Sequence, residues 1–165
     1  MLRTLLGRLT LLPTEKIDSI LEQHEAAPHL RQGQSVLASE VLRLVRGSQA
    51  VEQAAATSSV VFSKVGVHEL GLKTLQLAAS NDTGGVQSYK LARGSLDNSL
   101  DRIAAAAGLC ASVSEARRQI KAGGLYINGT RVSAASSKVE EQDLVDGAAF
   151  VLRAGKKKHV VVFVE

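Results

Sequence analysis

The chain has little of what builds disulfide frameworks, aromatic surfaces or membrane spans. Its 165 residues include one cysteine, no tryptophan and 3% aromatic residues. The single cysteine, Cys110, excludes an internal disulfide and a cysteine-based zinc cluster within one chain, which fits a reducing compartment. So few aromatic side chains give little support to a surface that stacks unpaired bases. No apolar run reaches the roughly eighteen residues that a membrane span needs.

Enzyme motifs are missing as well. The sequence contains no G-x-x-x-x-G-K-[ST], no G-x-G-x-x-G, no G-x-S-x-G and no H-E-x-x-H. The four histidines, His24, His29, His68 and His159, are scattered, which favours surface or capping roles over metal ligation. We therefore expect no cofactor, no metal site and no catalytic residue in this chain.

Basic side chains are concentrated in two stretches of the second half. The net charge is only +4, and residues 1–93 and 94–165 each carry ten Lys and Arg against eight Asp and Glu. Residues 112–138, however, hold five basic residues against the single acid Glu115, and residues 153–159 hold four with no acid. These nine residues are Arg117, Arg118, Lys121, Arg131, Lys138, Arg153, Lys156, Lys157 and Lys158. Segregated positive charge favours a polyanionic partner.

Residues 1–62 predict a series of helices, and residues 63–94 predict a linker. In the first segment apolar residues recur at helical spacing, Pro13 has the form of a helix start and Gly47 that of a helix stop. From residue 63 onward the periodicity fades and Gly, Ser, Asn, Asp and Thr accumulate. Such a composition is typical of a flexible linker, with one short helix expected near residues 72–79.

Residues 95–165 predict two helices followed by strands. The first helix is expected over about residues 96–107. Ser112 and Glu115 form a capping box, in which the serine oxygen accepts the Glu115 amide and the glutamate returns to the serine amide. The second helix therefore starts at Val113, and two adjacent glycines end it.

A β-hairpin is predicted where Asn128-Gly129 interrupts an alternating run, because both central positions of a type I′ turn need a positive φ. In that register Tyr126 lies opposite Arg131, and this pair is the only candidate that the sequence offers for stacking a base. Another strand pair is expected within residues 150–164. Its tip carries Lys156, Lys157 and Lys158.

The basic cluster on the second predicted helix has two interpretations. Arg117, Arg118 and Lys121 share the face opposite the apolar residues, where like charges one turn apart oppose helix stability by about 0.2–0.5 kcal/mol. The cluster is either a solvated helix face or a surface that binds phosphates, since guanidinium groups pair with two phosphate oxygens at once. The lysine tip supplies a second basic element and favours structured RNA, recognised through its backbone.

The order "SEARRQI", "YING" and "GKKKHVVVFV" resembles the S4-like RNA-binding domain over about residues 95–160. The resemblance implies an α+β fold in which two helices pack on a small mixed or antiparallel sheet. Such domains occur on ribosomal protein S4, pseudouridine synthases, heat-shock ribosome-binding proteins and tyrosyl-tRNA synthetases. The domain alone does not choose among them.

The rest of the chain resembles the tyrosyl-tRNA synthetase family. "LASEVLRLVRG" followed by "AVEQAAATSSVVFS" is similar to the helical anticodon-binding region of the bacterial-type enzyme, and "LRAGKKKHVVVFVE" to its C-terminus. The implied organisation is a helical region over residues 1–62, a linker over 63–94 and an S4-like domain over 95–165. The implied partner is tRNA(Tyr), with RNA contacts at Arg117, Arg118, Lys121, Tyr126, Asn128, Arg131, Lys156, Lys157 and Lys158.

The family's ATP-handling signatures, of the HIGH and KMSKS types, have no counterpart in this sequence. The resemblance therefore implies a C-terminal fragment that binds tRNA without aminoacylating it, monomeric although the parent enzyme is a homodimer. The Ala/Ser-rich linker is more similar to fungal mitochondrial members, which implies the mitochondrial matrix, and the bacterial cytoplasm is the alternative. Some such members also bind group I intron RNA and help it splice. A stand-alone ribosomal-RNA-binding S4 protein is the competing hypothesis.

Overall fold

A computed structural model describes residues 1–62, 66–80, 86–155 and 158–165. The chain divides into two compact units, Met1–Glu52 and Gln53–Glu165. The boundary falls within helix α4 (Ser48–Phe62), ten residues before the predicted end of the helical region. Each unit is described by itself.

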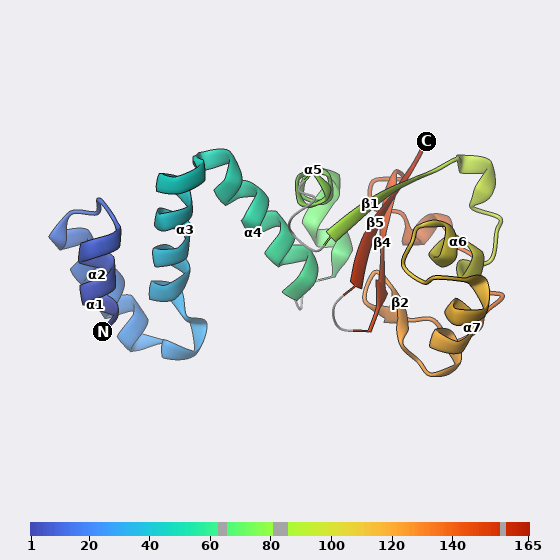
Figure 1. The fold of residues 1–165 in the computed structure, drawn as a ribbon, viewed down its shortest axis with the longest axis horizontal. Coiled ribbons are helices and arrows are strands. Elements are labelled where there is room, and N and C mark those ends of the chain that lie inside the picture. Colours follow the sequence, from blue (N-terminus) through green and yellow to red (C-terminus); the bar gives the residue numbers. More distant parts are fainter. Residues whose placement is uncertain (63–65, 81–85, 156–157) are drawn as a thin grey trace. The chain divides into compact units, whose positions relative to one another are not determined.

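The first unit is a set of short helices (Figure 1). They are α1 (Leu2–Leu9), α2 (Thr14–Ala26), the 3₁₀ turn η1 (Pro28–Leu30), α3 (Gln32–Arg46) and the start of α4. The predicted punctuation is confirmed, because Pro13 precedes α2 and Gly47 ends α3 at a φ of 86°. Leu6 is fully buried, and Gly33 lets the Leu2 side chain approach α3 so closely that a Cβ there would lie 2.4 Å from it.

The apolar stripe on α3 is covered only in part. Its two C-terminal members, Leu44 and Val45, are 52% and 75% exposed, although helical spacing predicts a continuous buried face. None of the helices in the described ranges is long and apolar enough to cross a membrane.

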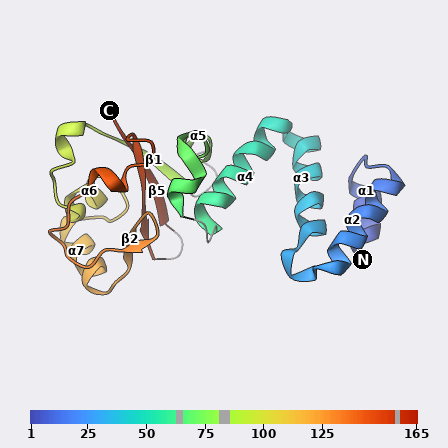
Figure 2. The ribbon, with the colours of Figure 1, turned by 180° about the vertical axis from the view of Figure 1, so that it is seen from behind.

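The second unit is a sheet with helices on both faces (Figures 1 and 2). In the described residues its strands are β1 (Val86–Leu91), β2 (Leu125–Ile127), β3 (Thr130–Arg131), β4 (Ala149–Ala154) and β5 (Lys158–Val164), in the order β1-β5-β4-β2-β3. Among these described strands, β1 and β5 are the one parallel pair. Helices α6 (Leu100–Ala106) and α7 (Val113–Lys121) pack on one face, and α5 (Val67–Ala79) with the end of α4 on the other. The predicted α+β class is confirmed.

The segment predicted to be a linker is part of this fold. Its described residues form α5, the strand β1 and the 3₁₀ turn η2 (Arg93–Ser95), and β1 pairs with β5 along six residues. The short helix expected near residues 72–79 is confirmed as the later part of α5. Two features hide the rest of this structure from a local reading. Gly71, at a φ of 69°, kinks α5, and β1 gains its order by pairing with the distant C-terminal strand.

Two cores follow from the alternation along the central strands. In β4, Phe150 and Leu152 pack toward α6 and α7, whereas Ala149 and Val151 pack toward α4 and α5. The next residue on the second face is Arg153, because side chains two apart on a strand share a face. Phe150, on the first of these faces, is completely buried.

Candidate nucleic-acid interface

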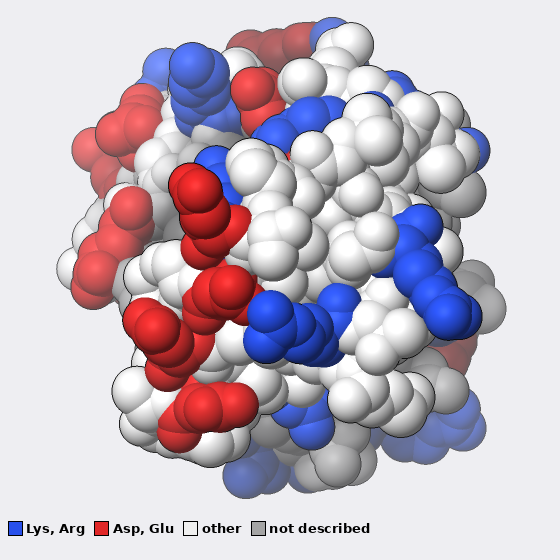
Figure 3. Space-filling view, turned by 90° about the vertical axis from the view of Figure 1, so that its left-hand side faces the viewer, with Lys and Arg blue, Asp and Glu red and all other residues white. Residues whose placement is uncertain are grey.

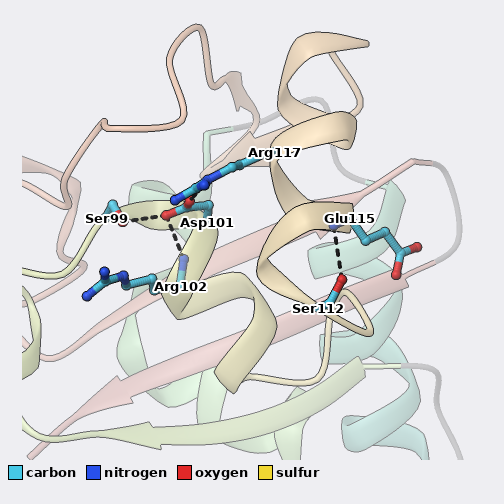
Figure 4. A network of polar contacts seen from close by, with 6 residues as sticks. All are labelled: Ser99, Asp101, Arg102, Ser112, Glu115 and Arg117. Atoms are coloured by element: carbon cyan, nitrogen blue, oxygen red, sulfur yellow. Dashed lines mark hydrogen bonds and ion pairs between the residues drawn. The ribbon is translucent and has the colours of Figure 1, made fainter.

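Helix α7 is fixed by its cap and its buried stripe. The Ser112 hydroxyl oxygen accepts a hydrogen bond from the Glu115 amide at 3.1 Å (Figure 4). The Glu115 carboxylate accepts from the Ala111 amide at 2.8 Å, one residue earlier than the predicted capping box has it. Ala116 and Ile120 are buried. The opposite face of the helix is thereby held toward solvent.

Three cations gather at the C-terminal end of this helix. Arg118 and Lys121 lie in its last turn and are exposed. The Arg131 side chain from β3 reaches the same end, because its Nη2 lies 1.8 Å from where a Cβ of Gly123 would stand. A Cβ at position 123 would displace the Arg131 guanidinium, and the φ of 71° there also favours glycine. The partial negative charge of the helix end favours cations here.

Arg117, unlike Arg118, forms an ion pair with a buried carboxylate. Its Nε donates to the Asp101 carboxylate at 2.6 Å, and the Asp101 side chain is only 2% exposed (Figure 4). Burial would raise the pKa of Asp101, but hydrogen bonds from Ser99, Arg117 and the Arg102 amide outweigh it and lower that pKa. Arg117 therefore ties α7 to α6.

The predicted hairpin is confirmed, with Asn128 and Gly129 both at positive φ and Tyr126 opposite Arg131. The Asn128 side chain, however, is committed within the protein. Its amide nitrogen donates to the Asp143 carbonyl at 2.5 Å and its oxygen accepts from the Val151 amide at 2.9 Å. This residue fastens the turn to the neighbouring chain.

Lys158 brings the C-terminal strand pair to α7. It opens β5 opposite Ala154 and lines a hollow with Glu115 and Gln119 of the helix. A hydrogen bond of 2.8 Å from the Gly155 amide to the Gly124 carbonyl joins the strand end to the helix end. The other two predicted contacts in this tip, Lys156 and Lys157, lie outside the described residues.

The hollow also contains the thiol of Cys110, which is buried. Burial raises the pKa of this thiol, Glu115 raises it further and Lys158 opposes both. The thiol is therefore protonated near neutral pH and is a core side chain. Among the described residues no group of His, Cys, Asp and Glu could hold a metal ion.

Tyr126 is half-buried beneath a second arginine. The Arg153 guanidinium lies 4.0 Å from the centre of the Tyr126 ring, since the two residues are partners across β2 and β4. The sequence shows the charge of Arg153 but gives no sign of this contact, because it depends on which strands pair. Asp101 was also missed, and His159 is buried in the sheet where a surface position was predicted.

A family model for the tyrosine–tRNA ligase SYY-like C-terminal domain matches residues 80–162. The chain belongs to this family. It is 35% identical to the tyrosine–tRNA ligase of Lactococcus lactis subsp. cremoris strain SK11 and 36% identical to that of Bifidobacterium animalis subsp. lactis strain AD011. These alignments cover 93% and 96% of this chain but 35% and 37% of the relatives. The chain thus spans about a third of their length.

In this tyrosine–tRNA ligase C-terminal region the excess positive charge belongs to one unit. Residues 1–52 carry six basic and six acidic residues, whereas residues 53–165 carry fourteen against ten. The face seen from the side of α1 and α2 shows both signs, with acidic side chains gathered along one side of it (Figure 3). The net charge of +4 is that of the second unit.

The structure divides the nine residues predicted to contact RNA into exposed cations, residues with partners inside the protein, and two residues outside the described ranges. Exposed cations gather around α7 at four positions, namely Arg118, Lys121, Arg131 and Lys158. We call these four residues the α7 surface. Arg117, Asn128 and Tyr126 each have a partner inside the protein.

Proposed function

We propose that this chain binds tRNA(Tyr) through the α7 surface and thereby supports tyrosyl-tRNA aminoacylation by the enzyme of which it forms the C-terminal region. The observation that carries the proposal is the convergence of Arg118 and Lys121 with Arg131 and Lys158 from two other segments. Family membership supports tRNA as the polyanion. The chemistry of tyrosine activation and transfer we assign to the remaining two thirds of the enzyme.

The four cations suit the backbone of structured RNA. The guanidinium groups of Arg118 and Arg131 each present a fork of donors that matches two phosphate oxygens, and Lys121 and Lys158 act as point charges. Arg118 and Lys121 are neighbours on one helix face. Binding releases counterions, so affinity falls as salt rises.

The test is the salt dependence of tRNA(Tyr) binding, measured by gel shift or fluorescence anisotropy with the full 165-residue chain. Arg118→Ala and Lys121→Ala should each reduce the slope of log affinity against log salt by about 0.7–0.9, because each removes one phosphate contact. Lys73→Ala is the matched control, since Lys73 is an exposed cation on α5. Unchanged slopes in both variants would show that RNA binds elsewhere.

The choice of RNA separates this function from that of a stand-alone ribosome-binding protein. We expect tighter binding to tRNA(Tyr) than to ribosomal RNA fragments, and weaker binding when the long variable arm is removed. Equal affinities with no dependence on that arm would favour the ribosomal function.

We infer a mitochondrial matrix location and a second ligand, group I intron RNA, from the sequence resemblance to fungal mitochondrial members. The α7 surface supports the second ligand only in that it recognises backbone rather than base sequence. Competition of intron RNA with tRNA(Tyr) tests it, and subcellular fractionation tests the location. A cytoplasmic location in a bacterium would refute the inferred mitochondrial location. A failure to bind intron RNA would refute the second ligand.

A further inference from the structure

A cavity of about 340 Å³ lies on the sheet face opposite α6 and α7. Its walls are the end of α4, the start of α5 and the Asn128-Gly129 turn, and its floor includes Val151, Arg153 and His159. This volume lies within the range of small-molecule sites, about 300–1,000 Å³. All of these residues belong to the second unit.

The cavity presents a cation that its surroundings do not neutralise. Arg153 lies along it, and none of the described lining residues is Asp or Glu. The Nε of Arg153 is buried and has no hydrogen-bond partner among the described residues. A buried donor without a partner is unfavourable, and more so when the group is charged. A ligand with anionic oxygens would remove this cost.

The same arginine is held in a fixed plane. One face of its guanidinium lies on the Tyr126 ring, at 4.0 Å from the ring centre. The residue also lines the cavity, so a flat group bound there would lie beside it. Bases stack on arginine planes as well as on aromatic rings.

The remaining walls suit a base and leave it a way in. Val60, Val67 and Val151 are apolar and buried. At the rim, Gly129 is exposed and a Cβ there would meet no atom within 4 Å. Ser59 on α4 lies partly exposed at the same cavity. The site is therefore open to solvent on the side of the hairpin turn.

We propose that this cavity, with Arg153 stacked on Tyr126 as its floor, binds one unpaired nucleotide of an RNA loop, its phosphate on the Arg153 donors and its base on the guanidinium plane. The proposal rests on the proposed function, since the RNA is the one that the α7 surface binds. It adds a second contact on the other face of the sheet. A nucleotide offers both the anionic oxygens and the flat ring that the cavity lacks.

The experiment is 2′-hydroxyl acylation footprinting of a tRNA(Tyr) transcript with the 165-residue chain, together with a measurement of its affinity. Arg153→Gln removes the cation, and Ser59→Phe fills the rim without touching the sheet. Both should weaken binding about tenfold and restore reactivity at one unpaired nucleotide that the wild type protects. Arg153→Lys should restore part of the affinity but not the protection. Arg102→Gln, an exposed charge loss on α6, is the control and should leave the footprint unchanged.

The outcomes separate this site from the proposed function. If tRNA(Tyr) binds and its salt slope depends on Arg118, yet Ser59→Phe and Arg153→Gln leave the footprint unchanged, the nucleotide site is refuted and the α7 surface stands. If wild-type protein shows no preference for tRNA(Tyr), the proposed function fails. Binding of free 5′-AMP that Ser59→Phe abolishes, with an unaltered tRNA footprint, would assign the cavity to a free nucleotide and overturn the RNA proposal.

Discussion

Arg117 and Arg118 are adjacent, yet their replacement by alanine should have opposite consequences. Arg117 pairs with Asp101, which is buried, whereas Arg118 faces solvent. We predict that Arg117→Ala lowers the free energy of unfolding of the second unit and that Arg118→Ala does not. Arg118→Ala should instead lower affinity for RNA.

The magnitude follows from the exposure of the two partners. Removing one member of a fully buried ion pair costs about 3–5 kcal/mol, and a hydrogen bond to a charged group contributes about 1.5–3 kcal/mol. The Arg117 side chain is 56% exposed, so water can replace it in part. Asp101 also keeps its bonds from Ser99 and the Arg102 amide. We therefore expect a loss of about 1–2 kcal/mol, against less than about 0.5 kcal/mol for Arg118→Ala.

The assay must assign the loss to the correct unit. Because the chain forms two compact units, a single unfolding curve does not report on one of them alone. Hydrogen exchange of peptides from α6 and α7 in increasing urea does, and a cycle with Asp101→Asn isolates the pair energy. Equal losses for the two arginine variants, or a coupling energy near zero, would refute the structural assignment of Arg117.

Three further predictions concern the same unit. The stability difference between wild type and Asp101→Asn should be constant from about pH 7 to pH 5, because the lowered pKa keeps the carboxylate ionised. It should shrink as the pH falls below the ordinary aspartate pKa of 3.8, and hydrogen exchange of α6 and α7 peptides in urea at each pH measures it. Asn128→Ala should lower the stability of the second unit by about 1–3 kcal/mol, read from hydrogen exchange of β2 and β4 peptides, since two hydrogen bonds are lost, and Asn128→Asp should keep only the one from Val151. Gly123→Ala should both strain the backbone by about 1–2 kcal/mol and displace Arg131, so the stability of α7 in hydrogen exchange and the affinity for RNA fall together.

Short sequence patterns predicted the elements that depend only on neighbouring residues. The Ser112 cap, the Gly47 stop and the Asn128-Gly129 turn were all predicted, because each depends on residues within one turn of chain. The α+β class followed from the order of those elements. The strand β1 was missed for the opposite reason. Its partner lies more than seventy residues away, and it is buried only at its two ends, so no alternation marks it.

The candidate site divides along the same line. Charge along the sequence located α7 and the lysine tip, and the structure brings Lys158 to the helix. What the sequence could not show was which cations are already paired. Asp101 reads as an ordinary acid in the first turn of a helix, and its burial appears only when α6 packs on the sheet. The cation over Tyr126 likewise depends on strand pairing.

The helical geometry of α7 explains why two neighbouring arginines separate in function. Successive residues on a helix point about 100° apart, so with Ala116 and Ile120 against the core, Arg117 faces α6 and Arg118 faces solvent. An arginine that already donates to a buried carboxylate attracts a phosphate less strongly, because the ion pair is close to neutral. The salt slope of RNA binding should therefore depend on the four residues of the α7 surface. Arg117→Ala should change the slope less than Arg118→Ala or Lys121→Ala does. The comparison of Arg117→Ala with Arg118→Ala tests this: if the two slopes fall equally, Arg117 binds RNA as well as Asp101. Arg117→Lys, which keeps the charge but not the guanidinium fork, should then restore the slope.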